Sequence, residues 1–457
     1  MPGRGSGAAT LRRNTTLQEV GSNTSTPMVQ VSFSAQDFIP QLKRHLEPFM
    51  AVKALTERTV EGGDRARRAF SGILQLAQDF STFLDDHGAR LNRTYAALAE
   101  YTACVRGFAK MGRHLAHLEV RLGHELPEPA GVHAQQFRDE VRRTLEFVKW
   151  SLANLQEEVF SEAGRLLGES LRFHPGPPMT RSRDDNLALP QDLDEDSVPE
   201  KERWIAEIAS KFLAHKEILD RESRLTKWTD LESMRTFVLE VSDEQQVRFF
   251  TTRIHNTLSR YDTYIQGTSI ESQDPDLPRF RTYVVASLHI LEVMIELVHF
   301  YERHENDVRC ELAKNRVSDL VDKEMVLDRI LNYSLHWLHV YMSEMVPQAE
   351  ALVQRYTLQT EVACMIPDGI SLHARPVSLI TRIVNHYGTP VRIKVGETTC
   401  YAGSILQVLM AVGANPKVRE VVFDGDGTPL ADLKLLFETG LGETDTPLPK
   451  ELAYLAR

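Results

Sequence analysis

The chain is poor in cysteine and has no excess of positive charge. Its 457 residues include four cysteines, none in a CxxC arrangement, which argues against a disulfide framework and against a zinc knuckle. The 53 Lys and Arg residues are outnumbered by 64 Asp and Glu residues, and the formal net charge is −11. Because this balance opposes the broad positive field of nucleic-acid-binding proteins, we expect no nucleic-acid partner.

The N-terminus lacks an apolar run of signal-peptide length, so export is not indicated. The most apolar stretch, residues 283–300, contains His289, Glu292, Glu296 and His299, which would be costly in a bilayer. We therefore predict a buried helix of a soluble protein and no transmembrane segment. Since nothing indicates oxidised thiols, the predicted location is cytoplasmic.

Motifs of self-contained enzymes are also missing. No GxxxxGK[ST] phosphate loop, GxSxG elbow or HExxH helix occurs, which excludes the commonest nucleotide-dependent and hydrolytic sites. Asp424-Gly425-Asp426-Gly427 begins like a calcium loop, but Leu435 stands where the bidentate Glu is required. We interpret this run as a tight turn into a helix capped by Thr428.

The length indicates several domains, and 42% apolar with 26% charged residues is ordinary globular composition. Apolar residues recur at three- and four-residue steps in two helical blocks, 29–172 and 202–357. Residues 1–28, rich in Gly, Ser, Thr and Asn, are expected to be a disordered tail, and the acidic, proline-containing 173–201 a linker. The two blocks fit either an old duplication or one bundle with a crossover connection.

After residue 357 the pattern changes to short β-branched segments separated by Pro and Gly. We predict strands at 360–366, 391–395, 398–402 and 418–424, and helices at 375–387, at 404–411 and after Thr428. This order, β-α-β-β-α-β-α, makes residues 358–442 a plausible single domain. The predicted fold is a large all-α helical region followed by an α/β (α+β) open-faced sandwich, with residues 443–457 as a C-terminal tail.

One run in this last region combines the features of an anion site. In Gly369-Ile370-Ser371-Leu372-His373-Ala374-Arg375-Pro376, His373 immediately precedes a predicted helix that holds Pro376 in its first turn. Backbone NH groups at a helix start lack intrahelical partners, and the helix dipole there favours negative charge. A neutral imidazole is a good nucleophile, and Arg375 can add a charge-assisted hydrogen bond to a phosphoryl group. A histidine that merely caps the helix is the alternative.

These residues resemble the histidine-containing phosphocarrier protein HPr of the bacterial phosphoenolpyruvate-dependent sugar phosphotransferase system. The resemblance rests on Leu372-His373-Ala374-Arg375-Pro376, on the order of elements around it, and on Ser404-Ile405-Leu406, which is similar to the family's regulatory serine segment. It implies that His373 accepts a phosphoryl group from an enzyme I-like donor and passes it to a downstream acceptor or regulated protein. It also implies that Arg375 helps to bind this group and that Ser404 is a regulatory phosphorylation site.

The resemblance covers less than a fifth of the chain and implies a phosphorelay substrate rather than a self-contained enzyme. It does not explain the helical region, whose size suggests regulation rather than bulk transport, with a homodimer through exposed helical faces as one assembly. One alternative is a helical interaction scaffold that uses the HPr-like domain only for docking. Another is an enzyme whose site lies around Glu296 and His336.

The helical blocks hold a few histidines and carboxylates at metal-ligand spacing. They are Glu296 with His299, His336 with His339, and His114 with His117 and Glu119. A di-metal carboxylate bundle needs two Glu-x-x-His pairs and two further Glu residues, and only one such pair is present. We therefore expect these side chains to flank helix cores, and we predict neither a metal nor a cofactor.

Overall fold

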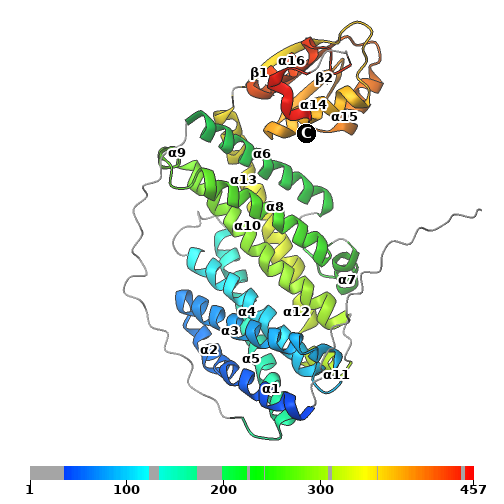
Figure 1. Ribbon diagram of the computed structural model, residues 1–457. Coiled ribbons are helices and arrows are strands. Elements are labelled where there is room, and N and C mark those ends of the chain that lie inside the picture. Colours follow the sequence, from blue (N-terminus) through cyan, green and yellow to red (C-terminus); the bar gives the residue numbers. More distant parts are fainter. Residues whose placement is uncertain are drawn as a thin grey trace, which may run out of the picture.

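The computed structural model describes residues 35–122, 133–171, 198–223, 227–240, 242–306, 311–357, 359–443 and 448–456. These residues are mostly helical, with one small four-stranded antiparallel sheet near the C-terminus (Figure 1). The predicted large helical region followed by a smaller α/β region is confirmed. The predicted tail, and the predicted linker up to residue 197, lie outside the described residues.

The first helical block is built around the helix at Ala96–Leu122. Its elements are α1 (Ala35–Phe49), α2 (Val52–Arg58), η1 (Thr59–Glu61), α3 (Gly63–Asp86), η2 (Ala89–Leu91), α4 (Ala96–Leu122) and α5 (His133–Leu167). Helix α4 packs against α3 and α5. On α3, the periodic residues Phe70, Ile73, Ala77 and Phe80 are all buried, so the three- and four-residue spacing marks the face that packs on α4.

The second helical block begins earlier than its sequence pattern indicated. Its elements are α6 (Val198–Glu222), α7 (Leu231–Glu240), α8 (Glu244–Tyr264), α9 (Ser269–Gln273), α10 (Asp276–His299), the π-helix η3 (Phe300–Asn306), α11 (Glu311–Leu320), α12 (Lys323–Asp328), the π-helix η4 (Arg329–Leu335) and α13 (His336–Tyr356). The block was predicted to start at residue 202, whereas α6 begins at Val198. Lys201, assigned to the linker, is buried in the first turns of this helix.

The two blocks share one hydrophobic core. Helix α10 packs against α4 of the first block as well as against α8 and α13 of its own, and the buried residues of both blocks form one continuous cluster. Phe108 of α4 meets Phe300 edge to face, with ring centroids 5.3 Å apart. The described helices of the two blocks therefore form one body.

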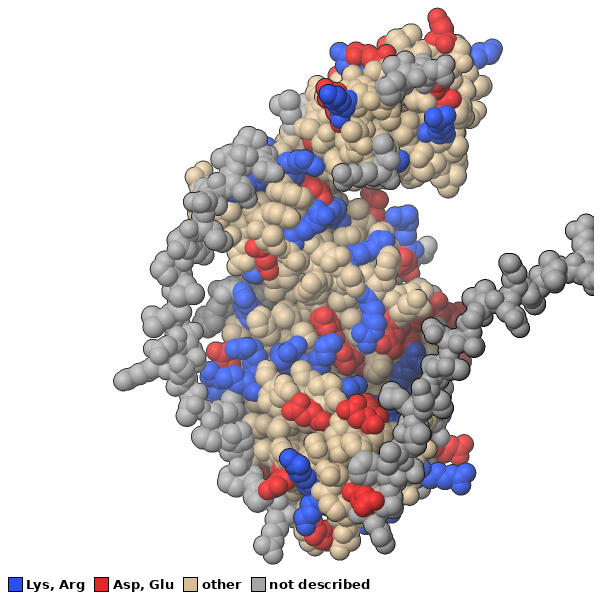
Figure 2. Space-filling model, viewed as in Figure 1, with Lys and Arg blue, Asp and Glu red and all other residues tan. Residues whose placement is uncertain are grey.

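One helical stretch, Asp276–His304, is long and apolar enough to cross a membrane, but 78% of its apolar window is buried inside the protein. Its carboxylates are paired within the helical region, because Lys110 of α4 lies 3.1 Å from Glu292 and 2.9 Å from Glu296. Such burial is typical of a core helix, and a buried helix is what the sequence predicted for this stretch. Acidic and basic side chains are interspersed over the face of the helical region in Figure 2, as on a solvated surface.

The C-terminal region alternates strands and helices. Its elements are β1 (Gln359–Met365), α14 (Ala374–Tyr387), β2 (Val391–Val395), β3 (Thr398–Tyr401), α15 (Ile405–Ala414), β4 (Glu420–Asp426), α16 (Gly427–Glu438) and η5 (Lys450–Ala456). The sheet order is β1-β4-β2-β3, and all neighbours are antiparallel. Along β2, burial alternates strictly, with Val391, Ile393 and Val395 in the core. One sheet face therefore packs on the helices, and the other face is open.

The last helix is capped by a different residue from the one predicted. Strand β4 continues to Asp426, and the helix starts at Gly427, so Thr428 already lies inside the first turn. The Asp426 carboxylate accepts a hydrogen bond from the Thr428 backbone NH at 3.3 Å and another from the Thr389 hydroxyl at 3.0 Å. The prediction of a Thr428 cap is wrong because the aspartate reaches the free NH groups first.

The segment predicted as a tail, 443–457, contributes to the C-terminal core in its described part. Leu452 and Leu455 are buried in the same cluster as the strands. The Tyr454 hydroxyl donates to Asp432 at 2.6 Å. The prediction failed because helices α14 and α16 leave apolar surface that this short segment covers.

The C-terminal region contacts the helical region through α6. The Arg203 guanidinium lies 5.0 Å from the centroid of the Tyr387 ring, a cation–π distance. Gly388 ends α14 with φ of 71°, and a Cβ built there would lie 2.7 Å from Cγ of Glu207. A glycine is therefore needed both for the helix end and for the close approach of α6.

Candidate functional site

His373 occupies the N-cap of α14 in an extended conformation, with φ of −92° and ψ of −171°. The loop before it is held at two points. Leu372 is buried in the C-terminal core, and Arg419 donates to the Ile370 carbonyl at 3.1 Å. Gly369, with φ of 80°, supplies the left-handed turn that begins the loop. The strand-to-helix junction therefore fixes the backbone while the imidazole remains free to face solvent.

The two ring nitrogens of His373 face different groups. Nδ1 accepts a hydrogen bond from the Arg375 backbone NH at 3.4 Å, so its lone pair points at the helix N-terminus. The first bond inside the helix runs from the Val377 NH to the His373 carbonyl at 3.1 Å, and Pro376 has no NH. The Ala374 and Arg375 amides are thus the donors at this helix start that an anion bound beside Nδ1 can use.

The candidate site is open to a partner protein. The His373 side chain is 52% exposed and the Arg375 side chain 71% exposed. The structure brings these two predicted site residues together on the first turn of α14. An exposed imidazole beside an exposed guanidinium suits a group that must be delivered by one protein and removed by another.

A third charged residue, Glu443, completes the site and was missed at the sequence level. Its Oε2 lies 3.5 Å from Nε2 of His373, and its Oε1 lies 3.7 Å from Nε of Arg375. Oε1 is buried and, among the described residues, has no hydrogen-bond partner. Glu443 therefore faces both predicted residues from the end of the chain segment that follows α16.

A tight turn delivers Glu443 to this position. Gly440, Leu441 and Gly442 all have positive φ, at 84°, 58° and 71°. The Leu441 side chain is buried in the C-terminal core, and a Cβ at Gly442 would lie 2.8 Å from Leu379 of α14. The Gly-Leu-Gly spacing after the helix is the signal by which sequence analysis could have found a chain reversal here.

Ser404 lies at a separate place, as the N-cap of α15. Its hydroxyl accepts a hydrogen bond from the Gln407 NH at 3.4 Å. The preceding Gly403 carbonyl accepts from Asn385, near the C-terminal end of α14, at 3.2 Å. Since about 12 residues of helix at ~1.5 Å each separate the two ends of α14, Ser404 is not adjacent to His373.

The histidines that the sequence paired in the helical region each have other partners. Glu296 pairs with Lys110, whereas Nδ1 of His299 lies 2.9 Å from Glu244 of α8. Nε2 of His339 lies 2.8 Å from the Ser223 hydroxyl, and burial lowers the pKa of His339 to about 4. Glu296, His299 and His339 therefore each contact a side chain outside their predicted pair.

His114 and His117 meet a third histidine, His289 of α10. Nδ1 of His114 lies 2.9 Å from Nδ1 of His289, and the rings of His117 and His289 have centroids 4.4 Å apart. Burial lowers the pKa of His289 to about 3, and it also lowers the pKa of His114 well below its usual value. The lowered pKa values of His114 and His289 favour neutral rings at pH 7, and the three histidines form a contact between α4 of the first block and α10 of the second.

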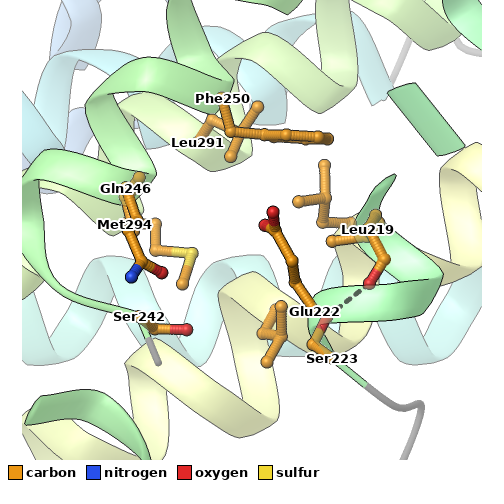
Figure 3. A pocket seen from close by; sticks show the side chains of 11 residues that line it. Leu219, Glu222, Ser223, Ser242, Gln246, Phe250, Leu291 and Met294 are labelled. Atoms are coloured by element: carbon orange, nitrogen blue, oxygen red, sulfur yellow. Dashed lines mark hydrogen bonds between the residues drawn. The ribbon is translucent and has the colours of Figure 1, made fainter. Parts of the chain in front are cut away.

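A pocket opens between α6, α8, α10 and α13, with about 410 Å³ of space, part of it open to solvent. Figure 3 shows apolar side chains around it, among them Phe250, Leu291 and Met294. The Glu222 carboxylate points into the space, and it is the one acidic or basic group among the described lining residues. The enzyme alternative placed its site around Glu296 and His336, and neither residue is among the described residues that line this pocket.

No protein-family model, curated protein or solved structure matches the chain.

Proposed function

We propose that the protein is an HPr-like phosphocarrier or phosphorylation-responsive regulator that accepts a phosphoryl group on His373. The observation that carries this proposal is the exposed imidazole at the start of α14, whose Nδ1 faces the helix amides beside Arg375. The order of elements around it, β1-α14-β2-β3-α15-β4-α16, supports the same assignment. The donor is an enzyme I-like phosphoprotein of a bacterial cytoplasm, and the acceptor is a downstream carrier or regulated protein.

Transfer uses the lone pair of Nδ1. This nitrogen attacks phosphorus, the N–P bond forms, and the bond between phosphorus and the donor breaks with its electron pair leaving on the donor. The phosphoryl oxygens then accept hydrogen bonds from the Ala374 and Arg375 amides, and the helix dipole stabilises their charge. Passing the group to an acceptor is the same step in reverse, so no bound nucleotide or metal is needed.

Arg375 and Glu443 set the charge of the site. A phosphoryl group adds about −1.5 to −2 charges, which the Arg375 guanidinium can meet with charge-assisted hydrogen bonds. In the unphosphorylated protein this guanidinium lies beside Glu443. Phosphorylation of His373 therefore exchanges an Arg375–Glu443 contact for an Arg375–phosphoryl contact and leaves Glu443 opposed to the new charge.

Ser404 is part of the proposal as a regulatory phosphorylation site. As the N-cap of α15 it would place a phosphate at a helix N-terminus, where negative charge is stabilised. Its distance along α14 from His373 means that such a phosphate would act on the docking partner rather than on the imidazole itself.

A docking role without transfer is the second candidate, and exposed apolar side chains favour it. Ile405, Leu406 and Met410 of α15 are 43%, 69% and 65% exposed. Apolar residues gathered on one surface helix are typical of a protein-binding face. This face could bind a phosphoryl donor during transfer. It fits equally well an interaction scaffold that uses the C-terminal region only for docking, with the helical region acting alone or as a homodimer.

The decisive experiment incubates the purified full-length protein with enzyme I and labelled phosphoenolpyruvate and scores acid-labile label. We expect label on the parent and on His255→Ala, which removes an exposed histidine of α8, but not on His373→Ala. Acid lability separates phosphohistidine from phosphoserine at Ser404. An unlabelled parent, with enzyme I active on another carrier, would leave docking as the function.

A further inference from the structure

A second cluster of chemically active side chains lies in the helical region, where α4 meets η3. Glu100 and Cys104 are one turn apart on α4, so they share a helix face. His304 comes from η3, about 200 residues further along the chain. Cys104 is fully buried, and the side chains of Glu100 and His304 are 11% and 6% exposed.

The three side chains converge on one point. Nδ1 of His304 contacts Oε1 of Glu100 directly. One oxygen of Glu100, the sulfur of Cys104 and one ring nitrogen of His304 all lie within 4.8 Å of one another. Among the residues that the structure describes, no other group of three histidine, cysteine or acidic side chains meets this condition.

The combination of a thiol, an imidazole and a carboxylate favours one class of metal ion. Thiolate sulfur, imidazole nitrogen and carboxylate oxygen are the usual ligands of Zn²⁺, whereas Ca²⁺ and Mg²⁺ prefer oxygen alone. A thiolate and a carboxylate balance the charge of a divalent ion, which matters at a site so far from solvent. Three protein ligands leave one tetrahedral position for water or another small ligand.

Two features outside the three side chains support a metal site at this place. The π-helix that carries His304 belongs to a rare class of turn that often occurs at functional sites. The second oxygen of Glu100 faces Nη1 of Arg90 at 3.6 Å, and Nε of Arg90 donates to Asp85 at 2.7 Å. This outer chain of charged side chains orients the Glu100 carboxylate, as outer-shell partners of metal ligands do.

We propose that Glu100, Cys104 and His304 form a binding site for a transition-metal ion of the Zn²⁺ class. The site joins α4 of the first helical block to η3 of the second. It is separate from His373, so it does not depend on the phosphocarrier proposal. The competing account is a buried Glu100–His304 hydrogen bond with Cys104 packed beside it as a small apolar side chain. The two accounts differ in whether the sulfur binds an ion.

The test uses the full-length protein, stripped with a chelator and titrated with Zn²⁺ against a chromophoric competitor. We expect one Zn²⁺ per chain, with affinity reduced at least ~10-fold in Cys104→Ser and in His304→Gln, since ligand loss should cost no less than loss of an outer-shell partner. Cys364→Ser, which changes a buried cysteine of the C-terminal core, is the matched control and should bind as the parent does.

The absorption spectrum of bound Co²⁺ provides a second measurement, which a change in protein stability alone cannot reproduce. A sulfur-to-cobalt charge-transfer band should appear in the parent and in Cys364→Ser and be absent in Cys104→Ser. Circular dichroism checks that each variant is folded, and Glu100→Gln replaces any variant that is not. A parent that binds no Zn²⁺, or Co²⁺ binding without the thiolate band, would overturn the proposal.

Discussion

The Glu443 carboxylate lies 3.5 Å from Nε2 of His373 and 3.7 Å from Nε of Arg375. One acidic side chain therefore contacts both residues of the proposed phosphoryl site. Because the incoming group is itself negative, Glu443 competes with it for Arg375 and repels it at His373. If His373 accepts a phosphoryl group as proposed, this arrangement favours the unphosphorylated form and makes the phosphoryl group easier to pass on.

Replacing Glu443 with Gln should therefore increase the phosphorylated fraction at equilibrium with enzyme I and a limited supply of phosphoenolpyruvate. Because the Arg375 side chain is 71% exposed, its pair with the partly buried Glu443 should contribute no more than ~1 kcal/mol, and the phosphorylation equilibrium should rise at most about fivefold. Labelled phosphate per chain measures it. Glu438→Gln, which removes an exposed carboxylate of α16, should leave the equilibrium unchanged, and a lower labelled fraction in Glu443→Gln would contradict this role.

Gly442 should be sensitive to substitution because it holds the turn that places Glu443. With φ of 71° and a Cβ position only 2.8 Å from Leu379, Gly442→Ala should lower the free energy of unfolding of the C-terminal region by about 1–2 kcal/mol. Gly413→Ala is the matched control, since a Cβ there meets nothing within 4 Å and alanine favours α15. In urea denaturation, Gly442→Ala should lower the free energy of unfolding and Gly413→Ala should raise it. Equal changes in the two variants would contradict this role of Gly442.

Much of the C-terminal fold could be predicted because its signals are local. Prolines and glycines separate its elements, and β2 alternates strictly in burial. The spacing of residues along the chain was therefore enough to predict its strands and helices. Glu443 could not be found this way, because its place depends on the left-handed turn at 440–442 and on packing against α14. In the cluster of Glu100, Cys104 and His304, the four-residue spacing puts only Glu100 and Cys104 on one helix face, and helix packing alone brings in His304.

The histidine contact between α4 and α10 should make the protein sensitive to acid. His114 and His289 share a hydrogen bond between their Nδ1 atoms, which requires one ring to donate and the other to accept. Burial and the nearby Arg113 and His117 lower the pKa of both rings, that of His289 to about 3. The nearest opposing charge, Glu292, lies 3.9 Å from Nε2 of His114.

A lowered pKa in the folded state means that the unfolded chain binds more protons between about pH 3 and the ordinary histidine value near 6.5. Stability is therefore complete above pH 6.5 and falls as the pH drops, by up to about 1.4 kcal/mol per pH unit for each histidine. His289→Gln should reduce the difference in unfolding free energy between pH 7.5 and pH 5. If the parent and the variant lose the same unfolding free energy between pH 7.5 and pH 5, groups other than His289 cause the loss of stability in acid.

Ser404→Ala should affect stability but not phosphate acceptance. The Ser404 hydroxyl caps α15 through one long hydrogen bond, so its loss should cost about 0.5–1 kcal/mol. Since Ser404 lies near the opposite end of α14 from His373, acid-labile labelling by enzyme I should stay at the parent level. Loss of that labelling in a folded variant would show that the hydroxyl itself takes part in transfer.

The most direct test of the central claim is to locate the phosphorus on the ring of His373. The account predicts that nuclear magnetic resonance of the ¹⁵N-histidine-labelled, enzyme I-phosphorylated protein shows phosphorus coupled to Nδ1, the nitrogen that faces the Arg375 amide, with the signal absent in His373→Ala. Phosphorus on Nε2 of His373, on another histidine, or on no histidine would contradict it.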